Sequence, residues 1–510
     1  MAHLASRRTR ALTLPVGLAL TASLGFLPTG TATAAPADEP VAAVRTDGPE
    51  LSYVVNTRAG HGTAKQVRKA ISAAGGTVVA SYDKIGVIVV HSQNPDFGAT
   101  IRKAKGVQSA GVTRTSPLVP QATKDIGVEQ PLTAGQARAA SQDAVAGQDP
   151  LEPLQWDLPA IKADKAHEKS LGSSEVTVAV LDTGVDDTHP DLAPSFDREA
   201  SVNCVSGAPD TTDGAWRPAA GESAHGTHVA GTIAAAKNGT GITGVAPGVK
   251  VSGIKVSTPA GFFYTEAVVC GFVWAAEHGV DVTNSSYYTD PWLFNCKDDP
   301  DQGALVEAVT RATRYAEGRG AVNIAAAGNS DHDLALDAIE DPTSPNDTVP
   351  VTRTVDPSAC PDIPTMVPGV VTVSATGAKN LKSSYSNYGL GVIDVAAPGG
   401  DSTRYQTPEA PAESGLILST LPGGGFGYMA GTSMASPHAA GVAALIKSTH
   451  PYASAAGVKA LLTRQADATA CGAPYDIDGD GTVDAVCEGG EQYNGFYGAG
   501  VVDALDAVRG

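Results

Sequence analysis

Aromatic and charged residues are both scarce in this chain of 510 residues, making up 5% and 17% of it. So few charges, together with 42% hydrophobic residues, argue against a disordered chain, and so few aromatics require a mainly aliphatic core. Lys and Arg are outnumbered by Asp and Glu, 35 against 54, which gives a net charge of −19. That charge argues against a nucleic-acid partner and against electrostatic binding to anionic lipid. The length is sufficient for two or three domains.

Long apolar runs are also missing, apart from one near the N-terminus. Residues 11–27 are apolar, follow Arg7, Arg8 and Arg10, and precede the small residues 32–34. This pattern is typical of a secretory signal peptide, whereas a transmembrane helix needs about 20 apolar residues. We therefore expect residues 1–34 to be a signal peptide, of either the general or the twin-arginine type. The mature protein is then expected to be secreted, extracellular and without membrane contact.

The six cysteines form neither a CxxC pair nor a cluster with the spacing of zinc ligands. In an exported chain, an even number of cysteines predicts disulfides, here three. Cys471 and Cys487 flank a short acidic loop, and we expect them to pair. The pairing of the remaining four stays open: Cys204, Cys270, Cys296 and Cys360.

Residues 50–115 predict a small α+β domain. Their periodicity gives the order strand, helix, strand, strand, helix, strand, at residues 51–56, 64–74, 77–82, 86–91, 97–105 and 107–112. This order is a ferredoxin-like signature. Residues 116–154 are rich in Ala, Gln and Pro with little periodicity, so we expect an exposed, protease-sensitive linker there.

Residues 155–510 alternate short β-rich runs with helical ones. Examples are the strands predicted at 176–181 and 249–256 and the helix predicted at 265–278. Such alternation predicts an α/β fold, with a mostly parallel sheet and helices on both faces. Ligand sites in these folds lie beyond the carboxyl ends of the strands.

The two parts differ in charge. Residues 50–114 carry 9 Lys and Arg against 3 Asp and Glu, a net charge of +6, whereas residues 155–510 carry −23. Opposite charges favour association of the two parts. Chance composition in a short segment is the alternative interpretation.

Three segments of the larger part combine residue types that carry hydrolytic chemistry. The first is the strand 176–181, which is followed by Asp182, Thr183 and Gly184. A parallel strand presents its last side chain at the functional edge of the sheet. Taken alone, this Asp could equally cap a turn, and an aspartic protease would need a second copy of the motif.

The second segment begins a predicted helix with His225, followed by small residues and His228. A zinc site would need two histidines at i and i+4 together with a Glu, and this spacing is absent. We expect His225 to be the reactive imidazole and His228 to be a hydrogen-bonded packing residue.

The third segment places Ser433 at the start of a predicted helix, after Gly431. A helix N-terminus offers free N–H groups and the positive end of the dipole, both of which stabilise negative charge beside the serine. An ordinary N-cap would explain the serine but not the run of small residues that follows at 439–445.

Asp182, His225 and Ser433 occur in the order used by subtilisin, not by chymotrypsin or the α/β-hydrolases. The three motifs resemble those of the subtilisin-like serine proteases, and the resemblance covers residues 155–508. It implies a subtilisin-like catalytic domain at 155–510, while residues 50–115 resemble the inhibitory pro-domain of the family. The implied function is that of a secreted serine endopeptidase, made as a self-processing zymogen, that uses an Asp-His-Ser triad and an acyl-enzyme.

The resemblance also implies further site residues. Asn329 and the Ser433 backbone N–H would stabilise the oxyanion, and the substrate-binding residues would be Ser286, Tyr287, Tyr288 and Gly328. Tyr288 stands where glycine is common in the family, and it could pack in the sheet or touch substrate. The preference of the S1 pocket therefore stays open.

An acidic loop predicts a calcium site. Its carboxylates occupy positions 1, 3, 5 and 9 of an EF-hand-like loop, with Gly481 at position 6: Asp476, Asp478, Asp480 and Asp484. Position 12 is Cys487 rather than Glu, and a merely solvated acidic turn is the alternative.

The resemblance adds Asp191 and Asn238 as ligands of the family's strong calcium site, although Lys237 lies beside Asn238. We expect structural Ca²⁺ and no cofactor in catalysis.

Two rival functions remain to be weighed. A catalytically inactive binding protein could use the same fold. An esterase would require Gly-x-Ser-x-Gly and the order Ser, Asp, His, but Ala435 occupies the position of the second Gly. The expected partners are protein or peptide substrates and the chain's own pro-domain, and we expect a monomer.

Overall fold

The structure, a computed structural model, describes residues 47–117, 129–402, 406–472, 474–476 and 480–509. The expected signal peptide at 1–34 and the candidate ligand Asp478 lie outside these residues. Residues 44–510 are grouped by their contacts into one unit, so the N-terminal region and the larger part are described together. Among the helices in the described ranges, none combines the length and hydropathy that crossing a membrane requires.

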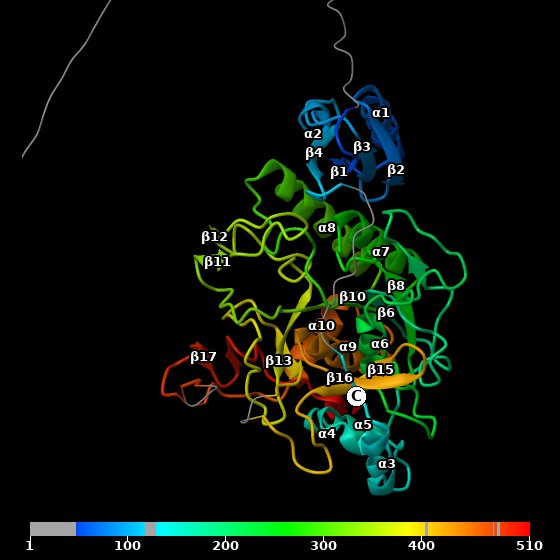
Figure 1. Cartoon of the computed structure of the whole chain (residues 1–510), viewed down its shortest axis with the longest axis vertical. Helices are drawn as coiled ribbons and strands as arrows, with labels where there is room; N and C mark the ends of the chain where they lie inside the picture. Colours follow the sequence, from blue (N-terminus) through cyan, green and yellow to red (C-terminus); the bar gives the residue numbers. More distant parts are fainter. Residues whose placement is uncertain (1–46, 118–128, 403–405, 473, 477–479, 510) are drawn as a thin grey trace, which may run out of the picture. The chain divides into compact units, whose positions relative to one another are not determined.

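The N-terminal region is the ferredoxin-like domain that the sequence predicts. Its strands pair antiparallel in the order β2-β3-β1-β4 (Figure 1). The elements are β1 (Leu51–Thr57), α1 (His61–Ala73), β2 (Gly76–Tyr82), β3 (Val87–Ser92), α2 (Phe97–Ile101) and β4 (Val107–Val112). Helix α2 ends four residues earlier than expected, because the N–H groups of Lys103 and Ala104 turn to carbonyls three residues back.

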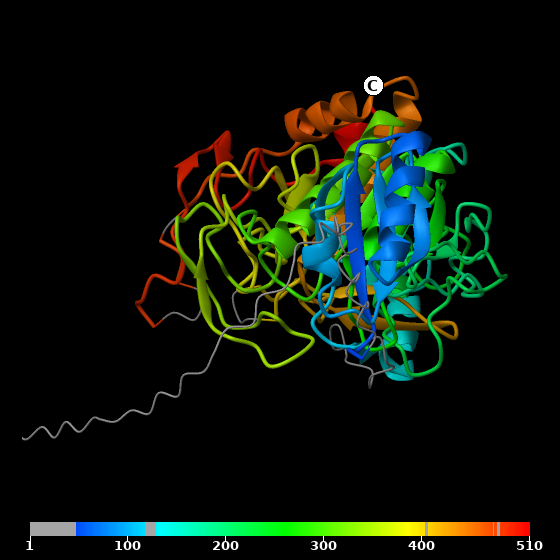
Figure 2. The ribbon, with the colours of Figure 1, turned by 90° about the horizontal axis from the view of Figure 1, so that it is seen from above.

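Strand β1 buries side chains on both of its faces. Tyr53 and Val55 pack in the core of the N-terminal region, whereas Val54 joins a core that includes Leu305 and Val309 of the larger part. Strands β1 and β4 contact helix α8 (Pro300–Gly318), and β1 also contacts α7 (Thr265–Glu277). Figure 2 shows the N-terminal region, in blue, against the green helices of the larger part.

A seven-stranded parallel sheet forms the centre of the larger part, in the order β14-β13-β10-β9-β6-β8-β7. The strands are β6 (Thr177–Asp182), β7 (Val202–Asn203), β8 (Lys250–Lys255), β9 (Val282–Ser285), β10 (Val322–Ala326), β13 (Val371–Thr376) and β14 (Val395–Pro398). This confirms the predicted subtilisin-like α/β architecture. The carboxyl ends of β10, β9 and β6 lie side by side, which decides where the site is built.

Helices cover both faces of this sheet because its strands are apolar on both sides. Val178 and Val180 of β6 face the core that contains α6 (His225–Ala234) and α9 (Thr432–Thr449). The alternate residues Ala179 and Leu181 face the core that contains α7 and α8 (Figure 1). The two-residue period of the strand thus places α6 and α9 on one face and α7 and α8 on the other.

Residues 129–154 have more regular structure than the linker that the sequence predicts, although most of residues 129–148 are exposed, as expected. They contain β5 (Gln130–Pro131), α3 (Ala134–Asp143) and the 3₁₀ helix η1 (Glu152–Leu154). Strand β5 pairs with β16 (Gly425–Met429), and a Thr133–Gln136 capping box begins α3. Ala140 and Leu151 are buried against Leu416 and Leu418. The segment gains order from these distant partners, and its own composition gives little sign of them.

Three disulfides link the six cysteines. Cys471 pairs with Cys487, as predicted. The structure also settles the pairing that the sequence leaves open, Cys204 with Cys270 and Cys296 with Cys360.

Shorter elements complete the larger part. They are α4 (Asp157–Ala160), α5 (Ala163–His167), β11 (Ile339–Asp341), β12 (Arg353–Val355), β15 (Ile417–Leu421), α10 (Ala455–Gln465), β17 (Gly489–Gly490), β18 (Tyr493–Asn494) and α11 (Ala504–Ala507).

Candidate active site

Asp182 is the last residue of β6 and is fully buried. Its Oδ1 accepts a hydrogen bond from the N–H of Thr183 at 2.7 Å, whereas Oδ2 has no hydrogen-bond partner among the described residues. Gly184 follows with φ 113°, and a Cβ there would lie 2.7 Å from the Trp216 carbonyl oxygen. The chain therefore turns sharply just beyond the carboxylate, as the Asp-Thr-Gly motif suggests.

His225 is the first residue of α6, and its Nδ1 lies 2.9 Å from Asp182 Oδ1. Both side chains are buried, with exposures of 3% and 0%. The next residue is Gly226, where a Cβ would lie 2.4 Å from the Gly184 carbonyl oxygen. A larger residue at 226 would push the helix away from β6, so this glycine allows the imidazole to reach the carboxylate.

His228 is a packing residue, as the sequence predicts. Its Nε2 lies 3.1 Å from the carbonyl oxygens of both Ile417 and Gly427. Burial lowers the pKa of His228 to about 3, so the ring is neutral at physiological pH.

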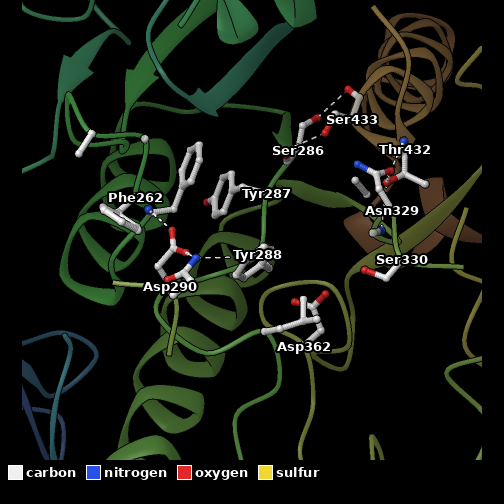
Figure 3. Close-up of a pocket in the computed structure, with 17 residues that line it drawn as sticks. Phe262, Ser286, Tyr287, Tyr288, Asp290, Asn329, Ser330, Asp362, Thr432 and Ser433 are labelled. Atoms are coloured by element: carbon white, nitrogen blue, oxygen red, sulfur yellow. Dashed lines mark hydrogen bonds between the residues drawn. The ribbon is translucent and has the colours of Figure 1, made fainter. Parts of the chain in front are cut away.

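Ser433 lies in the first turn of α9, which begins after Gly431. Its hydroxyl donates to the Ser286 carbonyl oxygen at 3.1 Å, and the Ser286 hydroxyl donates to the Ser433 carbonyl oxygen at 3.0 Å (Figure 3). These reciprocal bonds join the helix N-terminus to the segment that follows β9. In this rotamer the Ser433 hydroxyl is directed at Ser286 and not at His225.

Asn329 follows β10 through Ala327 and Gly328, and its side chain is exposed. Its Oδ1 accepts from both the N–H and the hydroxyl of Thr432, each at 2.8 Å (Figure 3). Because the amide oxygen is used in this way, the amide nitrogen is available to donate beside Ser433. Gly328, with φ 102°, donates its N–H to the same Thr432 hydroxyl at 3.0 Å.

A pocket of about 320 Å³ adjoins Ser433 and Asn329. The residues expected to bind substrate line it, namely Ser286, Tyr287, Tyr288 and Gly328. Further lining residues had no distinguishing sequence motif: Ala260, Gly261, Phe262, Phe263, Asp290, Leu293, Ala326, Ser330, Asn346, Asp362 and Thr432.

The two tyrosines of the pocket both pack and face the cavity. The Tyr287 ring stacks on Phe263, with centroids 4.3 Å apart and planes 3° apart. The Tyr288 hydroxyl accepts a hydrogen bond from the Asn346 amide at 2.8 Å. The bulk of Tyr288 is thus held at the pocket wall, where the family commonly has glycine.

The expected calcium ligands Asp191 and Asn238 lie together. Asp191 Oδ1 accepts from the Asn238 amide at 3.3 Å and from the Thr240 hydroxyl at 3.0 Å, and Oδ2 accepts from the Ile242 N–H at 3.0 Å. Burial raises the pKa of Asp191, and these hydrogen bonds offset part of the effect. Lys237 is held 2.8 Å from Glu152 in an ion pair.

The acidic loop is ordered by its own backbone where it is described. Asp476 accepts from the N–H groups of Asp480 and Gly481, at 3.2 and 2.9 Å, and the Asp484 N–H donates to the Tyr475 carbonyl. Within the described part of the chain, no three His, Cys, Asp or Glu residues are grouped as a metal site would require.

Comparison with known proteins defines the class. The Subtilase family, peptidase S8, matches residues 173–500, which is more than half of the chain. The chain therefore belongs to the subtilase family of serine proteases.

Individual relatives agree with this assignment. The M-protease of Shouchella clausii (strain KSM-K16) is 33% identical over 296 residues, covering 58% of this chain and 60% of that protein. Subtilisin Savinase of Lederbergia lenta is 32% identical over 296 residues, covering 58% and 85%. The crystal structure of the epidermin leader peptide processing serine protease of Staphylococcus aureus has a TM-score of 0.64 at 21% identity, covering 90% of this chain and 98% of that one. At that identity the likeness shows the fold alone.

Proposed function

We propose that this protein is a secreted serine endopeptidase in which Ser433 is the nucleophile, His225 the general base and Asp182 the residue that orients it. The observation that carries the proposal is the buried His225–Asp182 hydrogen bond of 2.9 Å, at the same sheet edge as a helix N-terminal serine. Membership of the subtilase family supports it.

The reaction proceeds in two stages. Rotation of the Ser433 side chain away from Ser286 brings its hydroxyl to His225, which takes the proton as the oxygen attacks the substrate carbonyl. His225 then passes the proton to the leaving amine, which leaves an acyl-enzyme. Water activated by the same imidazole hydrolyses the acyl-enzyme and regenerates Ser433. Asp182, bonded to Nδ1, holds the ring in the required tautomer and stabilises the imidazolium.

The negative charge that forms on the carbonyl oxygen needs fixed donors. The Asn329 amide nitrogen and the Ser433 N–H are the proposed pair. Thr432 supports the first of these because it binds Asn329 Oδ1 twice at 2.8 Å. Removing such a donor costs about 100- to 1000-fold in kcat, a range measured in subtilisin itself.

Hydrolysis of casein and of a short-chain ester, each with and without a serine-directed inhibitor, tests the proposal. We expect inhibitor-sensitive cleavage of casein. Ser206→Ala is the matched control, because Ser206 is exposed and does not line the pocket. Ester cleavage without proteolysis would instead support an esterase, and the absence of both activities would support a binding protein.

We further propose that residues 50–115 are an inhibitory pro-domain, removed after export directed by residues 1–34. The chain that leaves β4 supports this. Ser116 donates its N–H to Asp347 at 3.0 Å, and the Arg114 guanidinium lies 3.8 Å from the centre of the Tyr264 ring. Asp347 and Tyr264 are next in sequence to the pocket residues Asn346 and Phe263, so the tail of the small domain reaches the rim of the candidate active site.

Structural calcium is proposed at Asp191 and Asn238. The described carboxylates of the acidic loop, Asp476, Asp480 and Asp484, are not grouped as a metal site requires. The oxygen donors fit the preference of Ca²⁺, and a cation would lower the raised pKa of Asp191. To bind through oxygen, the Asn238 side chain must turn its amide nitrogen away from Asp191. Bound calcium would stabilise the folded state.

Thermal unfolding with calcium and with a chelator tests this site. A bound ion at 100 times its Kd adds about 2.7 kcal/mol of stability, so the chelator should lower Tm. Asp191→Asn should reduce the difference, whereas Asp356→Asn, a loop carboxylate away from both sites, should keep it. Equal Tm values under both conditions would contradict the proposal.

A further inference from the structure

The pocket beside Ser433 has acidic side chains and no basic ones. Among its lining residues, Asp290 and Asp362 carry carboxyl groups, and none is Lys, Arg or His. The remaining polar groups are hydroxyls and amides. The lining therefore offers carboxyl groups but no cationic group of its own.

Asp362 is the unusual member of this lining. Its side chain is 2% exposed, and its Oδ1 has no hydrogen-bond partner among the described residues. Burial raises the pKa of Asp362 well above the ordinary value, and no neighbouring cation lowers it. Figure 3 shows its carboxyl group directed toward the side of the pocket where Tyr288 and Ser330 lie. A buried carboxyl oxygen without a hydrogen-bond partner is costly unless a donor binds to it.

Asp290 provides an internal comparison. Its carboxylate accepts from the Phe263 N–H and from the Asn346 amide, each at 2.5 Å (Figure 3). These bonds hold Asp290 in place and explain it as a structural residue. Asn346 uses its amide nitrogen in this contact and in one with Tyr288, while its Oδ1 has no partner among the described residues. The pocket wall thus contains two acceptor oxygens, Asp362 Oδ1 and Asn346 Oδ1, that lack donors among the described residues.

The residues that line the pocket indicate which group would supply those donors. It opens beside Ser433 and Ser286, so the side chain that precedes the scissile bond enters it. Apolar wall residues, among them Tyr287 and Ala326, can contact an aliphatic stem. Lys and Arg combine such a stem with a terminal cation that carries several donors.

We propose that Asp362 is the specificity-determining residue of this pocket and that the enzyme cleaves peptide bonds after Lys or Arg. This inference rests on the proposed endopeptidase function. When the substrate cation enters, Asp362 gives up its proton to solvent and forms a buried, charge-assisted hydrogen bond with the ammonium or guanidinium group. Tyr288 limits the width of the pocket, which favours a long, narrow side chain.

The test uses peptides that differ only in the residue before the cleaved bond: Arg, citrulline, Lys and Phe. Citrulline has the shape of Arg without its charge. For the mature enzyme we expect kcat/KM to be about 100-fold higher for Arg than for citrulline, because a buried charge pair forms only with Arg. Asp362→Asn should reduce this ratio to near one and raise cleavage after Phe. Asp356→Asn, which removes the same charge outside the pocket, should keep the Arg preference.

Each outcome bears on a different statement. Equal cleavage after Arg and citrulline by the mature enzyme overturns the inference and leaves the endopeptidase function standing. An Arg preference that survives in Asp362→Asn overturns the assignment to Asp362. If Asp362→Asn does not fold, the ratio in the unmodified enzyme decides whether the pocket selects a cation. Failure to cleave casein or any of the peptides overturns the proposed function and the inference with it.

Discussion

The N-terminal region and the larger part differ in charge, +6 on residues 50–114 against −23 on residues 155–510. The contacts between the two regions include ion pairs that match this difference in charge. Cations of the small region pair with carboxylates of the large one at Arg102–Asp301, Arg114–Glu266 and Lys84–Glu277. A charge difference that is visible in the composition therefore reappears as specific pairs across one interface.

Charge is not the whole of this interface. Val54, Ile85 and Val87 of the small region share a core with residues of α7 and α8. Arg311 of the large part donates to the carbonyl oxygens of Thr57 and Gly86, at 2.5 and 3.0 Å. Apolar burial, hydrogen bonds to backbone carbonyls and ion pairs therefore all contribute to the interface.

The largest expected effect comes from removing the serine that would separate the two regions. Ser433→Ala should remain a full-length chain, while the unmodified protein separates into two pieces. Activity should fall by about 10⁶-fold, the loss measured for the serine of subtilisin itself. Gel electrophoresis and casein hydrolysis check both expectations. Self-processing of the purified variant would exclude Ser433 as the nucleophile, and Ser206→Ala should process normally.

Arg114→Ala tests the buried ion pair between Arg114 and Glu266. The substitution is made in the Ser433→Ala protein, which should remain a full-length chain. Arg114 and Glu266 are 9% and 0% exposed, so removing the cation leaves a buried carboxylate without its counter-ion. Such a loss costs about 3–5 kcal/mol. A lower urea midpoint for dissociation and unfolding of the N-terminal region would agree with this. An unchanged midpoint would show that apolar contacts alone hold the interface.

The same pair predicts a pH dependence. Burial alone would raise the pKa of Glu266, but the Arg114 charge and hydrogen bonds from Thr113 and Arg114 hold it below its ordinary value of 4.5. The stabilisation is therefore present above pH 4.5 and is lost as the pH falls below it. Urea midpoints between pH 6 and 3 should fall more steeply with Arg114 present than in Arg114→Ala. If the urea midpoints of both proteins fall equally with pH, the pH dependence does not come from the Arg114–Glu266 pair.

The smallest effect is expected at the exposed pair. Lys84 and Glu277 are 65% and 33% exposed, and their nitrogen and oxygen lie 2.7 Å apart. Solvent and salt screen such a pair, so Lys84→Ala should leave the urea midpoint nearly unchanged. A shift as large as that of Arg114→Ala would contradict this expectation, because it would mean that exposure to solvent does not weaken the Lys84–Glu277 pair.

Local sequence patterns were sufficient to predict much of the fold and three candidate site residues. Asp182 ends a buried strand, and His225 and Ser433 each begin or nearly begin a helix, so each position has a signal in its neighbouring residues. Parallel topology then brings strand ends to one edge. The prediction that Asn329 and the Ser433 N–H together stabilise the oxyanion came instead from family resemblance.

The misses share a physical cause. Residues 129–154 are ordered by β16 and by Leu416 and Leu418, which are distant in sequence. Both faces of β1 are buried, but Ser52 and Asn56 make one of them mostly polar, so periodicity alone does not reveal the second buried face.

The sequence by itself determined the alternation of strands and helices, the small N-terminal domain, the Cys471–Cys487 pair and the triad candidates, because these depend on local periodicity, spacing and residue type. Only the tertiary structure decided the other two disulfides, which residues of the basic and acidic regions pair, and the placement of Asp362 in the pocket wall. Asp362 follows Cys360 in an irregular segment, where no period marks which way a side chain faces. Its burial and lack of partners arise from neighbours that the chain brings together only on folding.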